Sequence, residues 1–118
     1  MPEASTPTVG LAVVHLFFRT APLADRAGIV AALDAAAERG DQAVVVALLG
    51  HKADLGVMAL SSDQWNLRRL QTDLVAAGLD LVDSYVSLTE SSEYAEGIPE
   101  EMKQARLYPQ LPPEGKPV

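Results

Sequence analysis

Cysteine is absent from the 118 residues of this sequence. A disulfide framework, a thiolate nucleophile and a cysteine-ligated metal site are therefore excluded for this stretch of chain. A chain without cysteine suits a reducing compartment, and we predict a cytoplasmic location. The first residues also lack a basic segment followed by an apolar stretch, so no secretory signal is predicted.

Basic residues and long hydrophobic runs are scarce as well. Nine Lys and Arg stand against 16 Asp and Glu, which gives a formal net charge of -7. Nucleic-acid binding needs clustered basic side chains, and only Arg68 and Arg69 are adjacent, so a nucleic-acid partner is not expected. No apolar run reaches the length that spans a membrane, and we expect no membrane partner.

What the sequence does contain is enough apolar material for one folded domain. Hydrophobic residues make up 48% of the chain and charged residues 21%, which argues against disorder. A chain of this length supports one hydrophobic core. From Ser91 the composition changes to Ser, Glu, Pro and Gly. We predict a domain over residues 1–90 and a linker or tail over residues 91–118.

Four segments have the composition of strands. Residues 9–19 are apolar at both alternating positions, which is typical of a strand covered on both faces. Residues 43–49 and 55–60 are short apolar runs joined by a short connection and predict a hairpin. Residues 79–90 alternate again, with Val82, Val86 and Leu88 opposite Asp83 and Tyr85.

Two segments between these strands predict helices. In the first, Pro22 suits an opening turn and Gly40 a C-terminus. In the second, Ser61 and Gln64 have the spacing of a capping box, and Gly78 suits the end. The expected apolar stripes are Ile29, Val30, Leu33 and Ala37 in the first helix and Leu67, Leu70, Leu74 and Ala77 in the second.

The resulting order, β-α-β-β-α-β, predicts an α+β fold of the ferredoxin-like type, with both helices on one face of an antiparallel sheet. The other face would be apolar and would leave a large hydrophobic patch in water. Pairing with a second sheet to form a dimeric α+β barrel removes that patch. We expect Val13, Val45, Val57 or their immediate strand neighbours to bury against it.

Few side chains offer chemistry. His15 lies inside an apolar strand, where a core or interface histidine is expected rather than a ligand. His51 and Lys52 lie in the hairpin connection without a second ligand at metal spacing, so no metal site is predicted. Tyr85 is expected to pack its ring and keep its hydroxyl in water. The residues alone therefore name no catalytic group in this chain.

Three segments carry a resemblance to a known family. They are Gly-His-Lys-Ala-Asp-Leu at residues 50–55, the Tyr-x-x-Leu-Thr-Glu pattern at residues 85–90, and Arg-Leu-Tyr-Pro-Gln-Leu-Pro at residues 106–112. In this order and spacing the chain resembles the amino-terminal half of the chlorite dismutase superfamily, most closely its coproheme decarboxylase branch.

The resemblance implies a function only for a completed assembly. In that family the porphyrin, the proximal histidine and the catalytic tyrosine belong to the carboxy-terminal half, so no catalytic residue is expected here. With such a half, the assembly would bind haem or iron coproporphyrin III and convert the latter to haem b, using peroxide to decarboxylate two propionates. Arg106 matches a family arginine that contacts a propionate, and we expect it to bind the cofactor.

Two other hypotheses remain open. The chain could be a catalytically inert ferredoxin-like domain that forms a homodimeric α+β barrel, or a cofactor-free enzyme of the dimeric barrel type. All three hypotheses require a partner, which is either a second ferredoxin-like half or a second copy of the chain. A higher homo- or hetero-oligomer is compatible with each of them.

Overall fold

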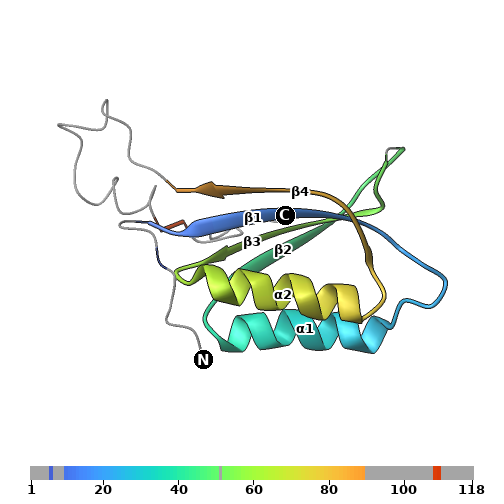
Figure 1. The fold of residues 1–118 in the computed structure, drawn as a ribbon, viewed down its shortest axis with the longest axis horizontal. Coiled ribbons are helices and arrows are strands. Elements are labelled where there is room, and N and C mark those ends of the chain that lie inside the picture. Colours follow the sequence, from blue (N-terminus) through green and yellow to red (C-terminus); the bar gives the residue numbers. More distant parts are fainter. Residues whose placement is uncertain (1–5, 7–9, 51, 90–107, 110–118) are drawn as a thin grey trace, which may run out of the picture.

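The computed structural model describes residues 6, 10–50, 52–89 and 108–109 of the chain. Its elements follow in the order β1 (Ala12–Arg19), α1 (Arg26–Glu38), β2 (Gln42–Ala47), β3 (Leu55–Ser61), α2 (Gln64–Ala76) and β4 (Asp80–Leu88). Figure 1 shows both helices on the same side of the sheet. The predicted α+β, ferredoxin-like order is confirmed.

The four strands form one sheet in the order β2-β3-β1-β4. Every neighbouring pair is antiparallel, and β1 and β3 occupy the centre. Strands β2 and β4 are the edges, so each has one side of its backbone without a strand neighbour among the described residues. No helix in the described part of the chain is long and apolar enough to cross a membrane.

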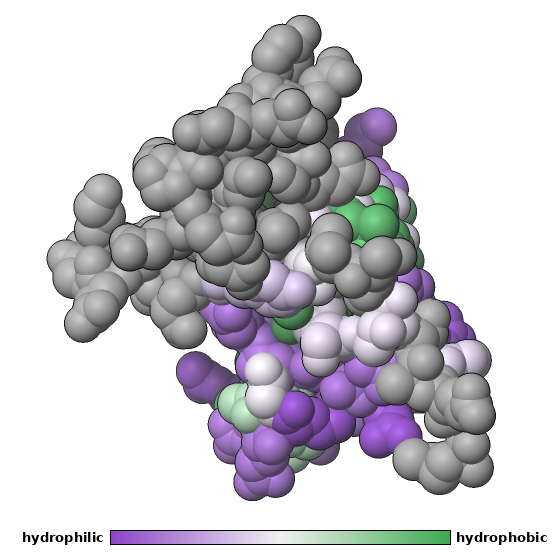
Figure 2. All heavy atoms as spheres, turned by 90° about the vertical axis from the view of Figure 1, so that its left-hand side faces the viewer, coloured by the Kyte–Doolittle hydropathy of each residue, from purple (hydrophilic) through white to green (hydrophobic). Residues whose placement is uncertain are grey.

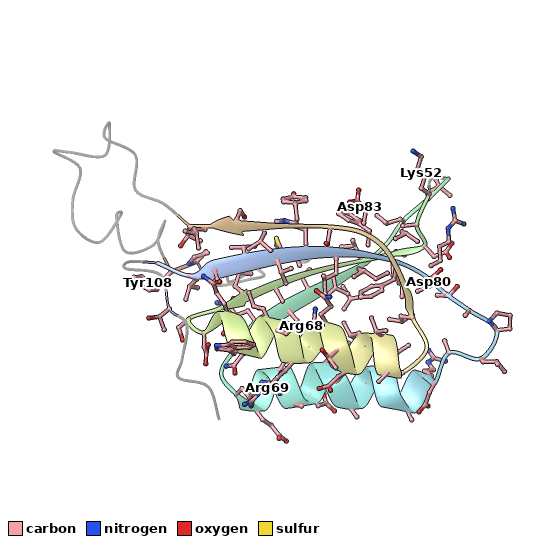
Figure 3. The ribbon with its side chains drawn as sticks, viewed as in Figure 1. Lys52, Arg68, Arg69, Asp80, Asp83 and Tyr108 are labelled. Atoms are coloured by element: carbon pink, nitrogen blue, oxygen red, sulfur yellow. The ribbon has the colours of Figure 1, made fainter. Side chains whose placement is uncertain are left out.

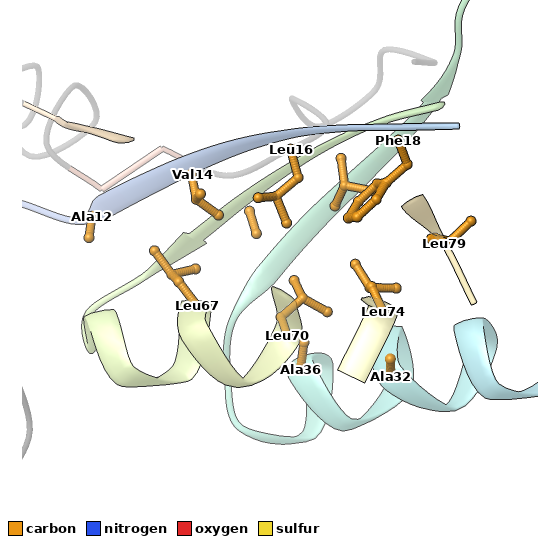
Figure 4. Packing of buried hydrophobic residues seen from close by; sticks show 12 residues of the cluster. Ala12, Val14, Leu16, Phe18, Ala32, Ala36, Leu67, Leu70, Leu74 and Leu79 are labelled. Atoms are coloured by element: carbon orange, nitrogen blue, oxygen red, sulfur yellow. The ribbon is translucent and has the colours of Figure 1, made fainter. Parts of the chain in front are cut away.

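The core lies between the sheet and the two helices (Figure 4). Strand β1 sends alternate side chains into it, as the two-residue period of a strand requires. Its largest buried member, Phe18, has Leu55 and Leu81 as strand partners. The buried cluster consists of Ala12, Val14, Leu16, Phe18, Ala32, Ala36, Val57, Ala59, Leu67, Leu70, Leu74 and Leu79.

Helix α1 differs from its prediction in the residue at which it begins and in the side chains that it turns to the core. It begins at Arg26, and Pro22 lies in the preceding turn, which the Ala24 amide closes by donating to the Ala21 carbonyl. Proline fixes φ near the value that such a turn needs at its second position. The backbone angle of Pro22 therefore favours this turn, and not the first turn of α1. Val30 and Ala37 are exposed.

The face of α1 turned to the core is one of small residues. Ala32 and Ala36 are fully buried, and Ile29 and Leu33 pack partly buried against the core. These four positions form the i, i+3, i+4, i+7 stripe of an amphipathic helix. Gly40 has a φ of 90°, and the Asp41 amide donates to the Ala36 carbonyl, so the predicted end of this helix is confirmed.

Helix α2 is capped by Asp63, and the predicted capping box at Ser61 is wrong. An Asp63 side-chain oxygen accepts a hydrogen bond from the Trp65 amide. Ser61 is still part of β3, where it pairs with Ala12. Its hydroxyl donates to Asp41 over 2.5 Å and accepts from the Asp63 amide. The serine hydroxyl thus joins the strand to the helix instead of capping the helix.

The end of α2 packs tightly on the segment before α1. Gly78 has a φ of 98°, and a Cβ placed on it would lie 2.9 Å from the Cα of Ala24. The Asp25 amide donates to the Ala77 carbonyl over 2.6 Å. The buried stripe of Leu67, Leu70 and Leu74 agrees with the prediction for this helix. At position 78 glycine is therefore required, both because of its positive φ and because a Cβ would collide with Ala24.

Candidate functional site

The surface of the sheet turned away from α1 and α2 is the most distinctive feature of the domain. We call this surface the open face. Strand register assigns to it the side chains that alternate with those of the core. They are Val13, His15, Phe17 and Arg19 on β1, Gln42, Val44 and Val46 on β2, Gly56, Met58 and Leu60 on β3, and Asp80, Asp83, Tyr85 and Ser87 on β4.

Three of its strands carry apolar side chains in adjacent rows. Val44, Met58 and His15 are consecutive partners across β2, β3 and β1. In the next row, Val46 and Phe17 flank Gly56. A Cβ on Gly56 would lie 3.1 Å from Val46 Cγ2, so the valine already fills the space above it. The open face is therefore a continuous apolar surface with few charges.

The two sides of the molecule differ in character. Figure 2 shows the lower part, where the helices lie, as largely hydrophilic, with the strongest hydrophobic colour higher up, at the level of the sheet. Of the residues predicted for this surface, Val13 lies on it but is already buried within the chain. Val45 and Val57 face the helices, because they pair with each other and Val57 belongs to the core. Their neighbours Val44 and Met58 lie on the open face.

An aromatic stack occupies the middle of the open face. The rings of His15 and Tyr85 are partners on β1 and β4, with centroids 4.2 Å apart and an interplanar angle of 12°. Phe17 extends the stack, its ring centroid 6.4 Å from that of Tyr85. Tyr85 lies on the edge strand β4 and is 54% exposed to solvent. Its ring lies against the ring of His15. Aromatic pairs of this kind hold side chains in a fixed geometry.

Burial affects the protonation of His15. Its Nδ1 atom is buried without a hydrogen-bond partner among the described residues. Desolvation lowers the pKa of His15 below its ordinary value of 6.5. The charged groups that share its face are Arg19 on β1 and Asp80 and Asp83 on β4, while β3 presents the uncharged Met58. The imidazole is consequently neutral near pH 7.

This predicts a stability change with pH that depends on His15. Because the folded pKa lies below the unfolded one, the unfolded chain binds the proton more readily, and stability falls as pH decreases from 6.5 through the lowered folded value. Urea-unfolding midpoints at pH 8, 7, 6 and 5 should show this loss. In His15→Phe the loss should be smaller over the same window, and parallel curves for the two proteins would contradict the assignment.

One end of the open face contacts residues distant in the sequence. The Gly10 amide donates to the Tyr108 hydroxyl over 3.0 Å, and Gln42 Nε2 donates to the Pro109 carbonyl over 2.7 Å. Gly10 precedes β1 and Gln42 begins β2, so Tyr108 and Pro109 contact both sides of the end of β3. Leu60, the partner of Gln42, is buried there.

The Gly-His-Lys-Ala-Asp-Leu segment has a structural role that the described residues explain. Asp54 accepts hydrogen bonds from the backbone and side chain of Thr20, and its amide donates to the Phe18 carbonyl. Gly50 has a φ of 63°, and Ala53 is buried. The segment fastens the β2–β3 connection to the end of β1.

The cofactor residue predicted from the sequence, Arg106, lies outside the described residues, and so does His51. In the described part of the chain, no group of three or more His, Cys, Asp or Glu side chains could hold a metal ion. His15 offers one buried nitrogen beneath an aromatic ring, which is no open position for a porphyrin iron. The described residues do not fit a porphyrin site within this chain.

The sequence did not reveal how β4 meets the open face. The register between β1 and β4 shifts between Phe17 and Phe18, and Val82 is the extra residue. This bulge brings Val82 beside Asp83 at one end of the open face, where strict alternation would separate them. The sequence Val82-Asp83 does not itself indicate a bulge. The bulge appears only when β4 is paired with β1.

No model of a known protein family matches the chain, and no curated protein matches it. The resemblance to the chlorite dismutase superfamily therefore stays a prediction that depends on the three sequence segments.

Proposed function

We propose that the domain acts as one half of an α+β barrel and associates through its open face with a second ferredoxin-like sheet. The observation that carries this is the apolar surface of three adjacent strands on the side without helices. Sheets that pack face to face lie about 10 Å apart and interdigitate such side chains. The helices already cover the other face, so only this one can accept a sheet.

The energetics favour such a partner. Burial of an apolar side chain contributes about 1.5 to 3 kcal/mol. Val46 is 41% exposed and Val44, Phe17 and Met58 are half-buried in this chain, so each would contribute part of that amount when a second sheet covers it. The neutral His15 adds little desolvation cost above pH 6.5, because burial already disfavours its charged form.

The resemblance suggests which second sheet this is. We propose the carboxy-terminal half of a chlorite dismutase-like haem protein of the coproheme decarboxylase type, so that the assembly handles iron coproporphyrin and the porphyrin lies in the partner. Two residues of the Arg-Leu-x-Pro-x-x-Pro element support this, since Tyr108 and Pro109 contact the end of the sheet. Arg106 belongs to the same sequence element, and we propose that it binds a propionate of the porphyrin.

A homodimeric barrel without a catalytic role is the second candidate. The same apolar face favours it, because a second copy would present the same surface about a two-fold axis. The two candidates differ in what the chain does when a carboxy-terminal half is present.

Sedimentation of the purified chain tests the common part of the proposal. We expect no stable monomer at micromolar concentration, because the open face would remain in water. Adding a separately produced family-type carboxy-terminal half should convert the sample to a one-to-one complex. A persistent homodimer in that mixture would support the second candidate, and a monodisperse monomer in every sample would contradict both.

Porphyrin titrations test the functional part. The chain alone should give no Soret band of histidine-ligated haem, whereas the complex with the carboxy-terminal half should bind iron coproporphyrin. In that complex Arg106→Ala should weaken binding by about 1.5 to 3 kcal/mol, the scale of a charge-assisted hydrogen bond. Arg106→Lys should restore part of the loss, since an ammonium lacks the two-pronged geometry. Equal affinity of all three proteins would remove Arg106 from the cofactor site.

A further inference from the structure

A hollow of about 550 Å³ lies at the end of the open face opposite Tyr108 and Pro109. Its wall comes from β1, β4 and the β2–β3 connection. The apolar part consists of Phe17, Leu48, Leu49, Ala53 and Val82. Its volume is within the range of pockets that hold small molecules.

The apolar wall is built by features that the fold fixes. The bulge in β4 places Val82 beside Phe17, and the Leu48 amide donates to the Asp54 carbonyl over 2.9 Å. Leu49 is 98% exposed. An exposed leucine beside an apolar hollow gains free energy when a ligand covers it, because its surface then leaves water.

The charged side chains of the hollow indicate which head group a ligand with an apolar chain would carry. Arg19 and Lys52 line it, and neither has an ion-pair partner within the part of the chain that the structure describes. Asp83 is the one acidic residue of the lining, so the three formal charges sum to +1. Figure 3 shows Lys52 and Asp83 on the side of the sheet away from the helices, and Arg68 on the helical side.

We propose that this hollow binds an apolar carboxylate, such as a medium-chain fatty acid, with the chain against Phe17 and Val82 and the carboxylate between Arg19 and Lys52. Two cations against one carboxylate in the lining favour an anionic head group over a neutral or cationic one. All lining residues belong to this chain, so no residue of a second sheet is needed to form the site. Phe17 also lies on the open face, so the second sheet of the proposed barrel would cover the Phe17 side of the hollow.

Calorimetric titration with decanoate below its micelle concentration tests the site. The matched probes are decyltrimethylammonium and decanol, which keep the chain and change the head group. Decanoate should bind at least tenfold more tightly than either. Arg19→Gln and Lys52→Gln should each weaken decanoate binding about tenfold, the scale of one charge-assisted hydrogen bond. Asp83→Asn should strengthen it severalfold, because it removes a repulsive charge.

The control is Arg68→Gln, which removes an exposed cation from α2 and should leave decanoate binding unchanged. A chain made monomeric by substitution of Val44 should bind decanoate at least as tightly as the unaltered chain, because no second sheet then covers Phe17, and this result separates the site from the assembly. Circular dichroism checks that each variant folds. Equal affinity for decanoate and decyltrimethylammonium, or unchanged binding in both Arg19→Gln and Lys52→Gln, would overturn the proposal.

Discussion

Val44→Glu should weaken association of the chain with its partner sheet by at least about a hundredfold. Val44 lies on the open face between the edge of the sheet and Met58. Substitution removes one buried valine, worth about 1.5 to 3 kcal/mol, and places an unpaired carboxylate among apolar side chains. Sedimentation velocity across a concentration series measures the dissociation constant, and the variant should be a monomer where the unaltered chain is not.

The neighbouring residue provides a matched control. Val45 belongs to the same strand but faces the helical side and is 43% exposed. Val45→Glu introduces the same charge at the same edge of the sheet, so it should leave the dissociation constant within about twofold of the original value. If both substitutions, or neither, abolish association, the open face is not the interface.

The apolar strands explain how far the open face could be predicted from the sequence. A run that is apolar at both positions, such as residues 9–19, indicates two covered faces, and the strand indeed lies in the centre of the sheet. The same pattern cannot tell which parity faces the helices. For this reason the prediction names Val45 and Val57 or their immediate neighbours, and the pairing of the strands places the neighbours Val44 and Met58 on the open face.

Helix starts illustrate a second limit. Pro22 and Ser61 were both predicted to open a helix, but Pro22 lies in the turn before α1 and the Ser61 hydroxyl joins β3 to Asp41. Local preferences identify a break between elements, whereas hydrogen bonds to distant residues decide the residue at which an element begins. The hollow escaped prediction because it needs the β4 bulge and the Asp54 contacts together.

The two faces of β1 allow folding and the proposed association to be tested separately. Phe18 points into the core and is fully buried, and Phe17 lies on the open face beside Tyr85. The side chains are chemically identical and adjacent in sequence, which makes them a direct test of whether folding and association are separable.

Phe18→Ala should cost about 3 to 5 kcal/mol of folding free energy, the range for deleting a buried aromatic side chain. Small domains have roughly 5 to 15 kcal/mol in total, so the variant should unfold at much lower urea. Phe17→Ala should cost far less in folding but should weaken association. The folding free energy of each variant is best measured in the Val44→Glu background, which is expected to be monomeric, because association itself stabilises the folded chain. Association is measured by sedimentation of each variant without the Val44 substitution. If Phe17→Ala destabilises the monomer as strongly as Phe18→Ala and leaves association unchanged, the open face serves the fold of this chain and not a second sheet.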